Sequence, residues 1–225
     1  MILKIFSNYS PNFDLVKRQS VQIKFLIFHY TGMRKESHAI KKLTNFKSNV
    51  SCNYFIKKTG ETLVMVPDLY VAWHAGKSRW KNFKSLNKYS IGIEISNPGH
   101  NFGYNQFSKE QIQSLIKLSK MLIKKYKIRP NNILGHSDIA PERKKDPGEK
   151  FPWKKLAKHR IGFWHSITLA RCKKNRGIKL NKTGENVFLN NLYTIGYLNK
   201  KFKKTINIKF KNYIIKAFQR RFRQE

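Results

Sequence analysis

Two short runs of residues constrain the fold more than any other feature of this sequence. Residues 23–29, Ile-Lys-Phe-Leu-Ile-Phe-His, form an apolar run that is typical of a buried strand. Residues 90–95, Ser-Ile-Gly-Ile-Glu-Ile, alternate with a period of two, which predicts a second strand. Each run ends close to a polar side chain, His29 or Glu94, so the strand ends are the first places to look for chemistry.

The segments between and after these strands predict helices that alternate with further strands. The other elements expected in the first part of the chain are a helix over 36–46, a hairpin over 53–66, a helix over 108–126 and a short strand over 132–135. Ser108 and Gln111 form a capping box at the start of the helix expected over 108–126. Strands separated by helices predict an α/β fold, with a single mixed central sheet and helices on its faces.

The composition changes after Trp153, and the rest of the chain becomes strongly basic. Residues 173–182 are basic and poor in large apolar side chains, which favours a linker. Two short helices are expected beyond it, over 187–195 and 213–222. We therefore expect a domain over residues 1–170 and a small helical appendage over 171–225. Two such helices bury little by themselves, so they must pack on the first domain or on a partner.

The charge of the chain leaves two interpretations open. The 225 residues hold 47 Lys and Arg against 12 Asp and Glu, a formal net charge of +35. Such a field attracts polyanions. The abundance of Lys, Asn, Ile, Phe and Tyr is equally typical of an A/T-rich coding bias, which leaves most lysines on a solvated surface. No recognisable nucleic-acid module is present, so we expect no specific nucleic-acid partner.

The sequence also limits the compartment and the kinds of metal site. No apolar run approaches the roughly 18 residues of a membrane span, and the first residues lack a secretory signal. If residue 1 is the true start, we expect a cytoplasmic protein. The two cysteines, Cys52 and Cys172, exclude a disulfide-rich scaffold and a metal cluster built from cysteine alone.

Three polar residues occupy positions that an apolar core would not give them. His29 ends a buried strand, His136 follows the strand over 132–135, and Asp146 lies in a loop before Pro147 and Gly148. Two imidazoles and one carboxylate are what an open catalytic zinc site uses. Each residue alone is more often structural, so spacing by itself does not select these three from the other histidines and aspartates.

Glu94 and Lys144 are weaker candidates when taken in isolation. Alternation places Glu94 on the strand face opposite Ile91, Ile93 and Ile95. A carboxylate there is costly if it is buried without a partner. It is either a paired core group or a base whose pKa is tuned by its surroundings. Lys144 is a surface residue by default in a chain so rich in lysine.

Several motifs, in order along the chain, favour catalytic over structural roles for these residues. They are Asn8-Tyr-Ser-Pro-Asn-Phe-Asp14, Phe28-His-Tyr-Thr-Gly32, Ala72-Trp-His-Ala-Gly76, Ser90-Ile-Gly-Ile-Glu-Ile-Ser-Asn-Pro-Gly99, Gly135-His-Ser-Asp-Ile-Ala-Pro141, Arg143-Lys-Lys-Asp-Pro-Gly148 and Phe151-Pro-Trp153. In this set the chain resembles the type 2 family of N-acetylmuramoyl-L-alanine amidases. These are zinc enzymes of the AmpD-like and AmiD-like kind, related to peptidoglycan recognition proteins. The resemblance covers roughly residues 8–165.

The resemblance implies a role for each candidate. It implies zinc as the cofactor, with His29, His136 and Asp146 as ligands, Glu94 as general base and acid, and Lys144 as the second oxyanion-stabilising group. The residues implied in substrate binding are His74, Trp73, Arg143 and Asn53. At Asn53 the family often carries His, which puts that one substrate contact in doubt. The alternative for His74 is packing beside Trp73.

The implied reaction is hydrolysis of the amide between the lactyl group of N-acetylmuramic acid and L-alanine. Water activated at the zinc attacks the carbonyl carbon, in peptidoglycan or in anhydro-muropeptides. A peptidoglycan-recognition protein without hydrolysis is the alternative. The AmiD-like opening favours the periplasm over the cytosol, and we expect a monomer. Residues 191–197 and 217–222 resemble two helices of a small peptidoglycan-binding domain, either truncated at residue 225 or packed on the catalytic domain as a remnant.

Overall fold

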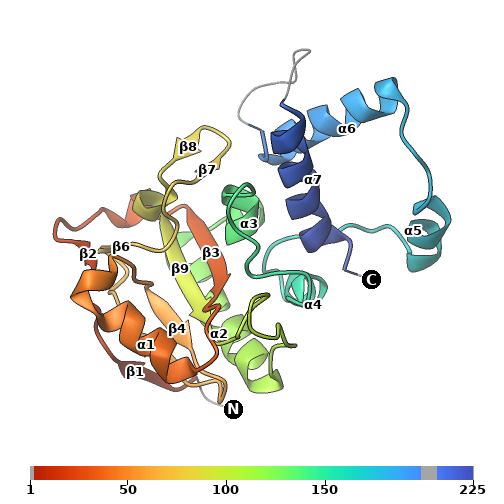
Figure 1. The fold of residues 1–225 in the computed structure, drawn as a ribbon. Helices are drawn as coiled ribbons and strands as arrows, with labels where there is room; N and C mark the ends of the chain where they lie inside the picture. The colour runs from red at the N-terminus through yellow and green to blue at the C-terminus, as the bar shows by residue number, and fades with distance from the viewer. Residues whose placement is uncertain (1–2, 199–206, 225) are drawn as a thin grey trace.

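A six-stranded sheet forms the centre of the computed structural model, which describes residues 3–198 and 207–224 (Figure 1). In spatial order its strands are β1 (Ile5–Ser7), β5 (Thr62–Val64), β4 (Tyr54–Ile56), β9 (Ser90–Ile95), β3 (Phe25–Tyr30) and β10 (Ile133–Gly135). β4 and β5 pair antiparallel, and every other pair is parallel. The sheet is therefore mixed, and the predicted α/β architecture is confirmed.

The two strands predicted from the apolar runs lie side by side in the sheet. β3 pairs with β9 on one side and with β10 on the other, in both cases parallel. In this register His29 lies opposite Glu94. The carboxyl ends of β3, β9 and β10 therefore meet at the same edge of the sheet, which is where open α/β sheets carry their ligand sites.

One face of the sheet is covered by α2 (Lys109–Tyr126) and α4 (Trp153–Lys158). α2 begins with the predicted capping box, in which the Ser108 hydroxyl accepts from the Gln111 amide at 3.0 Å and the Gln111 side chain accepts from the Ser108 amide at 3.0 Å. The core on this face joins sheet residues to helix residues: Leu26, Phe28, Ile91 and Ile93 with Leu115, Leu118, Leu122, Trp153 and Leu156.

The opposite face is covered by four helices from distant parts of the chain. They are α1 (Glu36–Thr44), α3 (His136–Ile139), α6 (Lys182–Ile195) and α7 (Ile208–Phe222). Figure 1 shows α6 and α7 on the α3 side of the sheet, away from α1. Their apolar residues Leu189, Leu192 and Ile214 share one core with Phe25 and Ile27 of β3. The C-terminal helices thus complete the core of the sheet.

Two short antiparallel pairs flank the sheet. β2 (Phe13–Asp14) pairs with β6 (Val71–Ala72), and β7 (Arg79–Trp80) pairs with β8 (Phe83–Lys84). Trp80 is 1% exposed, and its ring packs edge-on against Tyr197, with the centroids 5.0 Å apart. The contact ties the β7–β8 hairpin to the C-terminal helices.

The linker predicted over residues 173–182 is shorter in the structure. A further helix, α5, covers Leu169–Asn175, and α6 already begins at Lys182. α5 buries none of its residues, so it carries no apolar stripe that a periodicity search could detect. α7 likewise begins earlier than predicted, at Ile208, where the side chain of Asn207 accepts from the amides of residues 209 and 210.

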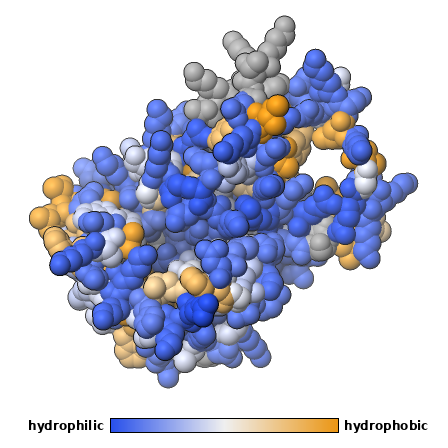
Figure 2. Space-filling view, in the orientation of Figure 1, coloured by the Kyte–Doolittle hydropathy of each residue, from blue (hydrophilic) through white to orange (hydrophobic). Residues whose placement is uncertain are grey.

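Hydrophilic side chains cover most of the face seen in Figure 2, and the apolar ones form small separate groups. Among the described residues, the exposed apolar side chains include Leu15 and Val16 near the N-terminus and Ile178 between α5 and α6. Scattered apolar residues of this kind are normal on a soluble surface.

Candidate metal centre and active site

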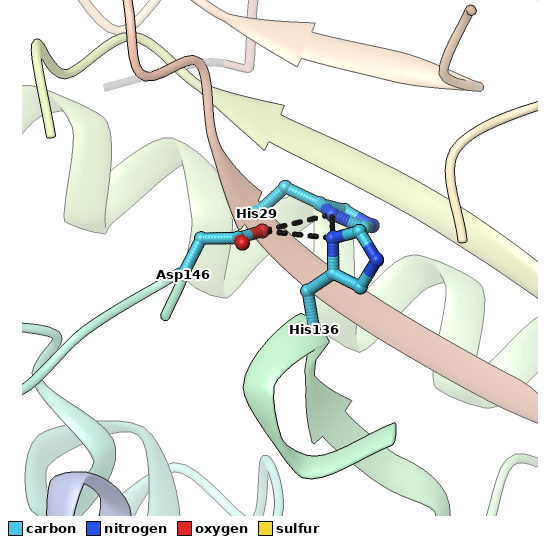
Figure 3. Close-up of side chains that lie close together, drawn as sticks. All are labelled: His29, His136 and Asp146. Carbon is cyan, nitrogen blue, oxygen red and sulfur yellow. Dashed lines mark hydrogen bonds and ion pairs between the residues drawn. The ribbon is translucent and has the colours of Figure 1, made fainter. Parts of the chain in front are cut away.

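Three side chains converge at the carboxyl edge of the sheet: His29, His136 and Asp146 (Figure 3). The Nδ1 atoms of the two histidines lie 2.9 Å apart, and Oδ2 of Asp146 lies 3.1 Å from the first and 3.0 Å from the second. All three residues are buried. Ligands that surround one tetrahedral zinc ion at 2.0–2.1 Å lie about 3.3 Å from one another. Both the spacing and the donor types therefore fit a zinc ion.

Separate parts of the chain supply the three side chains. His29 lies near the end of β3, and His136 begins α3 directly after β10. Asp146 lies in the loop after α3, where its carbonyl oxygen accepts from the Ser137 amide at 2.8 Å. The loop passes so close to β10 that a Cβ on Gly135 would lie 2.6 Å from the Pro147 ring. Glycine is required there by this close approach.

The electrostatics of the cluster favour metal binding. Burial, assisted by the neighbouring His136, lowers the pKa of His29 to about 4. Burial acts to raise the pKa of Asp146, but the charge and hydrogen bonds of His136 and His29 prevail and hold it below its usual value. A neutral imidazole and an ionised carboxylate are the protonation states that a divalent metal ion binds.

The second ring nitrogen of each histidine has a buried partner. Nε2 of His29 lies 3.0 Å from Nδ1 of His74, and Nε2 of His136 lies 3.1 Å from the carbonyl oxygen of Ala75. Because a carbonyl oxygen only accepts, the proton of neutral His136 is on Nε2 and its Nδ1 lone pair faces the cluster. Such partners orient the ligands of most protein metal sites.

The α3 turn that carries His136 is supported from the C-terminal helices. Oδ2 of Asp138 accepts from the Gly135 amide at 2.8 Å and from Nη1 of Arg221 at 2.7 Å. The hydroxyl of Tyr197 donates to the other oxygen of Asp138. Arg221 is 2% exposed, and its guanidinium lies over the Trp153 ring, 4.1 Å from the centroid. The position of His136 thus depends on residues about 60 and 85 positions later.

Glu94 faces the same site from β9. Its Oε2 atom is buried and makes no hydrogen bond to any part of the chain that the structure describes. Burial, together with the charge of Asp146, raises the pKa of Glu94 to about 8, and the charge of Lys144 opposes this shift. A divalent cation in the cluster would also favour the carboxylate. An unpartnered carboxyl beside a metal site is positioned to accept and return a proton.

A cavity of about 360 Å³ joins these groups to the surface. His136, Asp146, Glu94 and Lys144 all line it. Lys145 also lines the cavity, but Lys144 is half-buried, whereas Lys145 is exposed. The other residues that line the cavity include Tyr30, Met33, Trp73, His100 and Arg143. The cavity is large enough for the reacting part of a substrate, and two of the three candidate ligands, His136 and Asp146, line it.

The residues predicted to bind substrate lie in four different settings. Trp73 lines the cavity, and its indole donates to Asp14 at 2.7 Å. Arg143 lines it too, with its guanidinium directed at the carbonyl oxygens of residues 75 and 77. His74 is 8% exposed and contacts His29. Asn53 is fully buried outside the cavity lining, where it accepts from the Gly92 amide at 3.0 Å and donates to the Val66 carbonyl at 3.1 Å.

These placements refine the sequence reading of the site. The side chain of Asn53 joins β9 to the segment that follows β5, and a substrate contact by Asn53 stays a prediction. The sequence reading did not assign roles to Ser90, which supports His74, or to Asp138, although both belong to the quoted motifs. Asp138 lies three residues after Gly135, the spacing at which a side chain can accept from the N-cap amide, and this spacing was the available signal for a supporting role.

Comparison with known proteins identifies the family. The family model for N-acetylmuramoyl-L-alanine amidase (Amidase_2) matches residues 19–149. The N-acetylmuramoyl-L-alanine amidase AmiD of Escherichia coli (strain K12) is 40% identical over 155 residues, which are 64% of this chain and 55% of AmiD. The chain spans about half the length of the first curated relatives that it matches, with 55%, 55% and 54% of each covered.

Solved structures agree with the sequence match. The complex of E. coli AmiD with the substrate anhydro-N-acetylmuramic acid-L-Ala-D-gamma-Glu-L-Lys has a TM-score of 0.74 at 34% identity and covers 90% of this chain and 81% of that chain. AmpDh3 from Pseudomonas aeruginosa in complex with anhydromuramic pentapeptide has a TM-score of 0.77 at 30% identity, with 93% and 86% covered.

Among the residues that the structure describes, no helix has the length and apolar character needed to cross a membrane. The motifs around His29, Glu94 and Asp146 lie within the matched segment, on a sheet that has the same fold as AmiD. The chain belongs to the N-acetylmuramoyl-L-alanine amidase family that this model defines.

Proposed function

We propose that this protein is a zinc-dependent N-acetylmuramoyl-L-alanine amidase that cleaves the amide between the lactyl group of N-acetylmuramic acid and L-alanine. The observation that carries the proposal is the site itself. Three ligand atoms lie within 3.1 Å of one another. Two of their residues, His136 and Asp146, line a cavity together with Glu94, whose Oε2 has no hydrogen-bond partner in the described chain. The complexes of AmiD and AmpDh3 with anhydromuramyl peptides support this substrate class.

The proposed ligand set is His29, His136 and Asp146, and the proposed cofactor is zinc. A zinc ion held by these residues would supply an activated water, because such an ion lowers the pKa of water from about 16 to about 7. The chain's contribution is to present two Nδ1 lone pairs and one carboxylate oxygen from buried positions, so that the ligands need little rearrangement on binding.

Glu94 is the proposed general base and acid. Its free oxygen lies at the cavity wall, beside the place where the substrate carbonyl must approach the ligand cluster. As a carboxylate it takes a proton from the attacking water, and as a carboxylic acid it returns that proton to the leaving amine. Burial makes both forms accessible near neutral pH, since the pKa of Glu94 is raised to about 8 without a metal ion and drawn down when one is bound.

Lys144 is the proposed oxyanion donor. Its half-buried ammonium group lines the cavity, and its charge acts on both Glu94 and His29. A preorganised donor of this kind is worth about 3–4 kcal/mol in the transition state. Trp73 and Arg143 in the cavity lining are the proposed substrate contacts, and the basic surroundings favour the carboxylates of a stem peptide.

The test is cleavage of a purified anhydro-muropeptide and of intact peptidoglycan, with products read by mass spectrometry. We expect one zinc per chain, release of the stem peptide, loss of release after chelation and its return when zinc is restored. Zinc-loaded protein that binds wall without releasing peptide would instead establish a recognition protein. Cleavage of anhydro-muropeptides alone would agree with a cytosolic role, and cleavage of intact wall with a periplasmic one. Size-exclusion chromatography tests the expected monomer.

A further inference from the structure

A chain of buried hydrogen bonds runs from His29 away from the metal site. Nε2 of His29 lies 3.0 Å from Nδ1 of His74. Nε2 of His74 lies 3.1 Å from the Ser90 hydroxyl, which donates to the carbonyl oxygen of Leu86 at 2.6 Å. His29, His74 and Ser90 are 1%, 8% and 0% exposed. We call these three side chains, with the Leu86 carbonyl, the histidine relay.

The end of the relay at Leu86 sets the direction of every hydrogen bond in it. A backbone carbonyl only accepts, so the single hydroxyl proton of Ser90 is used on Leu86. Ser90 must then accept from His74, whose Nε2 therefore carries a proton. Neutral His74 is left with a lone pair on Nδ1, which accepts from Nε2–H of His29. The remaining lone pair of His29, on Nδ1, faces His136 and Asp146.

The surrounding strands are built to hold the His74 ring in this place. A Cβ on Gly92 of β9 would lie 2.4 Å from Cγ of His74, so a residue without a side chain is needed beside the ring. The side-chain oxygen of Asn87 accepts from the His74 and Ala75 amides, at 3.2 and 2.7 Å. The ring also packs edge-on against His29, with the centroids 5.1 Å apart. Asn87 therefore holds the backbone of His74, and Gly92 and His29 enclose its ring.

We propose that His74 is a positioning residue that sets the tautomer and orientation of His29. In this role it acts on the metal site through the relay. The inference rests on the proposed function, in which His29 is a zinc ligand. His136 reaches the same tautomer through the carbonyl of Ala75, so the two histidines are oriented by independent means. Removing such a partner from a metal ligand typically costs about 10–100-fold in metal affinity.

The experiment compares four full-length variants: His74→Leu, His74→Asn, Ser90→Ala and the matched control His100→Leu. Leucine removes both ring nitrogens, whereas asparagine keeps an acceptor near the position of Nδ1. His100 also lines the cavity, but its ring nitrogens pair with Tyr30 and Glu149 instead of the ligand cluster. Zinc dissociation constants are measured by competition with a chromophoric chelator. The ring nitrogens of metal-free protein are observed by ¹⁵N NMR.

We expect metal-free wild type to hold His29 with its proton on Nε2. We expect His74→Leu to weaken zinc binding by about 10–100-fold and to mix the two His29 tautomers. The zinc dissociation constants of His74→Asn and His100→Leu should stay within a few-fold of wild type. That of Ser90→Ala should lie between those of wild type and His74→Leu.

The proposal is overturned by a proton on Nδ1 of His29 in the wild type, a measurement that needs no variant to fold. It is also overturned if His74→Leu binds zinc as tightly as wild type, or if His74→Asn loses as much affinity as His74→Leu. Failure of the proposed function is a different result, since wild-type protein would then bind no zinc or release no peptide.

Discussion

Replacing Glu94 by glutamine should remove activity and yet stabilise the metal-free protein, by an amount that grows with pH. Burial raises the pKa of Glu94 from 4.5 to about 8. Each tenfold change in an ionisation constant is worth about 1.4 kcal/mol, so the native state disfavours the carboxylate by up to about 5 kcal/mol. Glutamine has the shape of the protonated form and carries no charge at any pH.

The sign follows from which state holds the proton more tightly. A carboxyl whose pKa is raised on folding retains its proton in the native state after the unfolded chain has released it. Glu94 therefore costs nothing below pH 4.5, and the free energy of unfolding falls as the pH rises from 4.5 to about 8. The difference between Glu94→Gln and wild type should be near zero at pH 4.5 and several kcal/mol at pH 8.

Urea unfolding of chelator-treated wild type and Glu94→Gln at pH 5 and pH 8 measures this difference. Glu149→Gln is the matched control with the opposite sign. Burial acts to raise the pKa of Glu149, but a backbone hydrogen bond and His100 lower it, so that variant should lose stability at pH 8. The reasoning is wrong if Glu94→Gln changes stability equally at both pH values, or destabilises the protein at pH 8. Zinc should shrink the pH dependence, because the cation favours the carboxylate.

Three further predictions, made for Arg221, Lys144 and His29, test other parts of the site. Arg221→Met should destabilise the protein by about 3–5 kcal/mol in urea unfolding, because it leaves the buried carboxylate of Asp138 without its cation, and adding Asp138→Asn should restore part of the loss. Lys144→Ala should lower kcat by about 100–1,000-fold with zinc content unchanged, whereas Lys145→Ala, on the exposed neighbour, should retain most of the rate; equal losses would contradict the assignment. His29→Ala should lose both zinc, read by metal analysis, and peptide release; an active variant would remove His29 from the ligand set.

Much of the fold could be predicted from local patterns. The run over 23–29 and the capping box at Ser108 are signals contained within a few residues, and both elements lie where the sequence places them. α5 was missed because it buries no residue, which leaves a short basic helix without the apolar stripe that periodicity detects.

The site residues also differ in how far the sequence could predict them. Spacing alone did not select His29, His136 and Asp146, and it was the set of family motifs that singled them out. The ion pair between Asp138 and Arg221 joins residues 83 positions apart, and no local pattern announces such a contact. His74 was assigned to the right segment, but the partners of its ring nitrogens depend on how β9 and the 86–90 turn fold around it.

The ion pair of Arg221 with Asp138 has a consequence for how the protein can be divided. Domains can be separated where an exposed, flexible linker with few contacts joins them. Here Arg221 of α7 is the counter-ion of Asp138, whose carboxylate accepts from the amide at the start of the turn that carries His136. Apolar residues of α6 and α7 also pack against β3. Removing this end would therefore disturb the candidate ligand cluster as well as the core, so a shortened variant should keep the chain through α7.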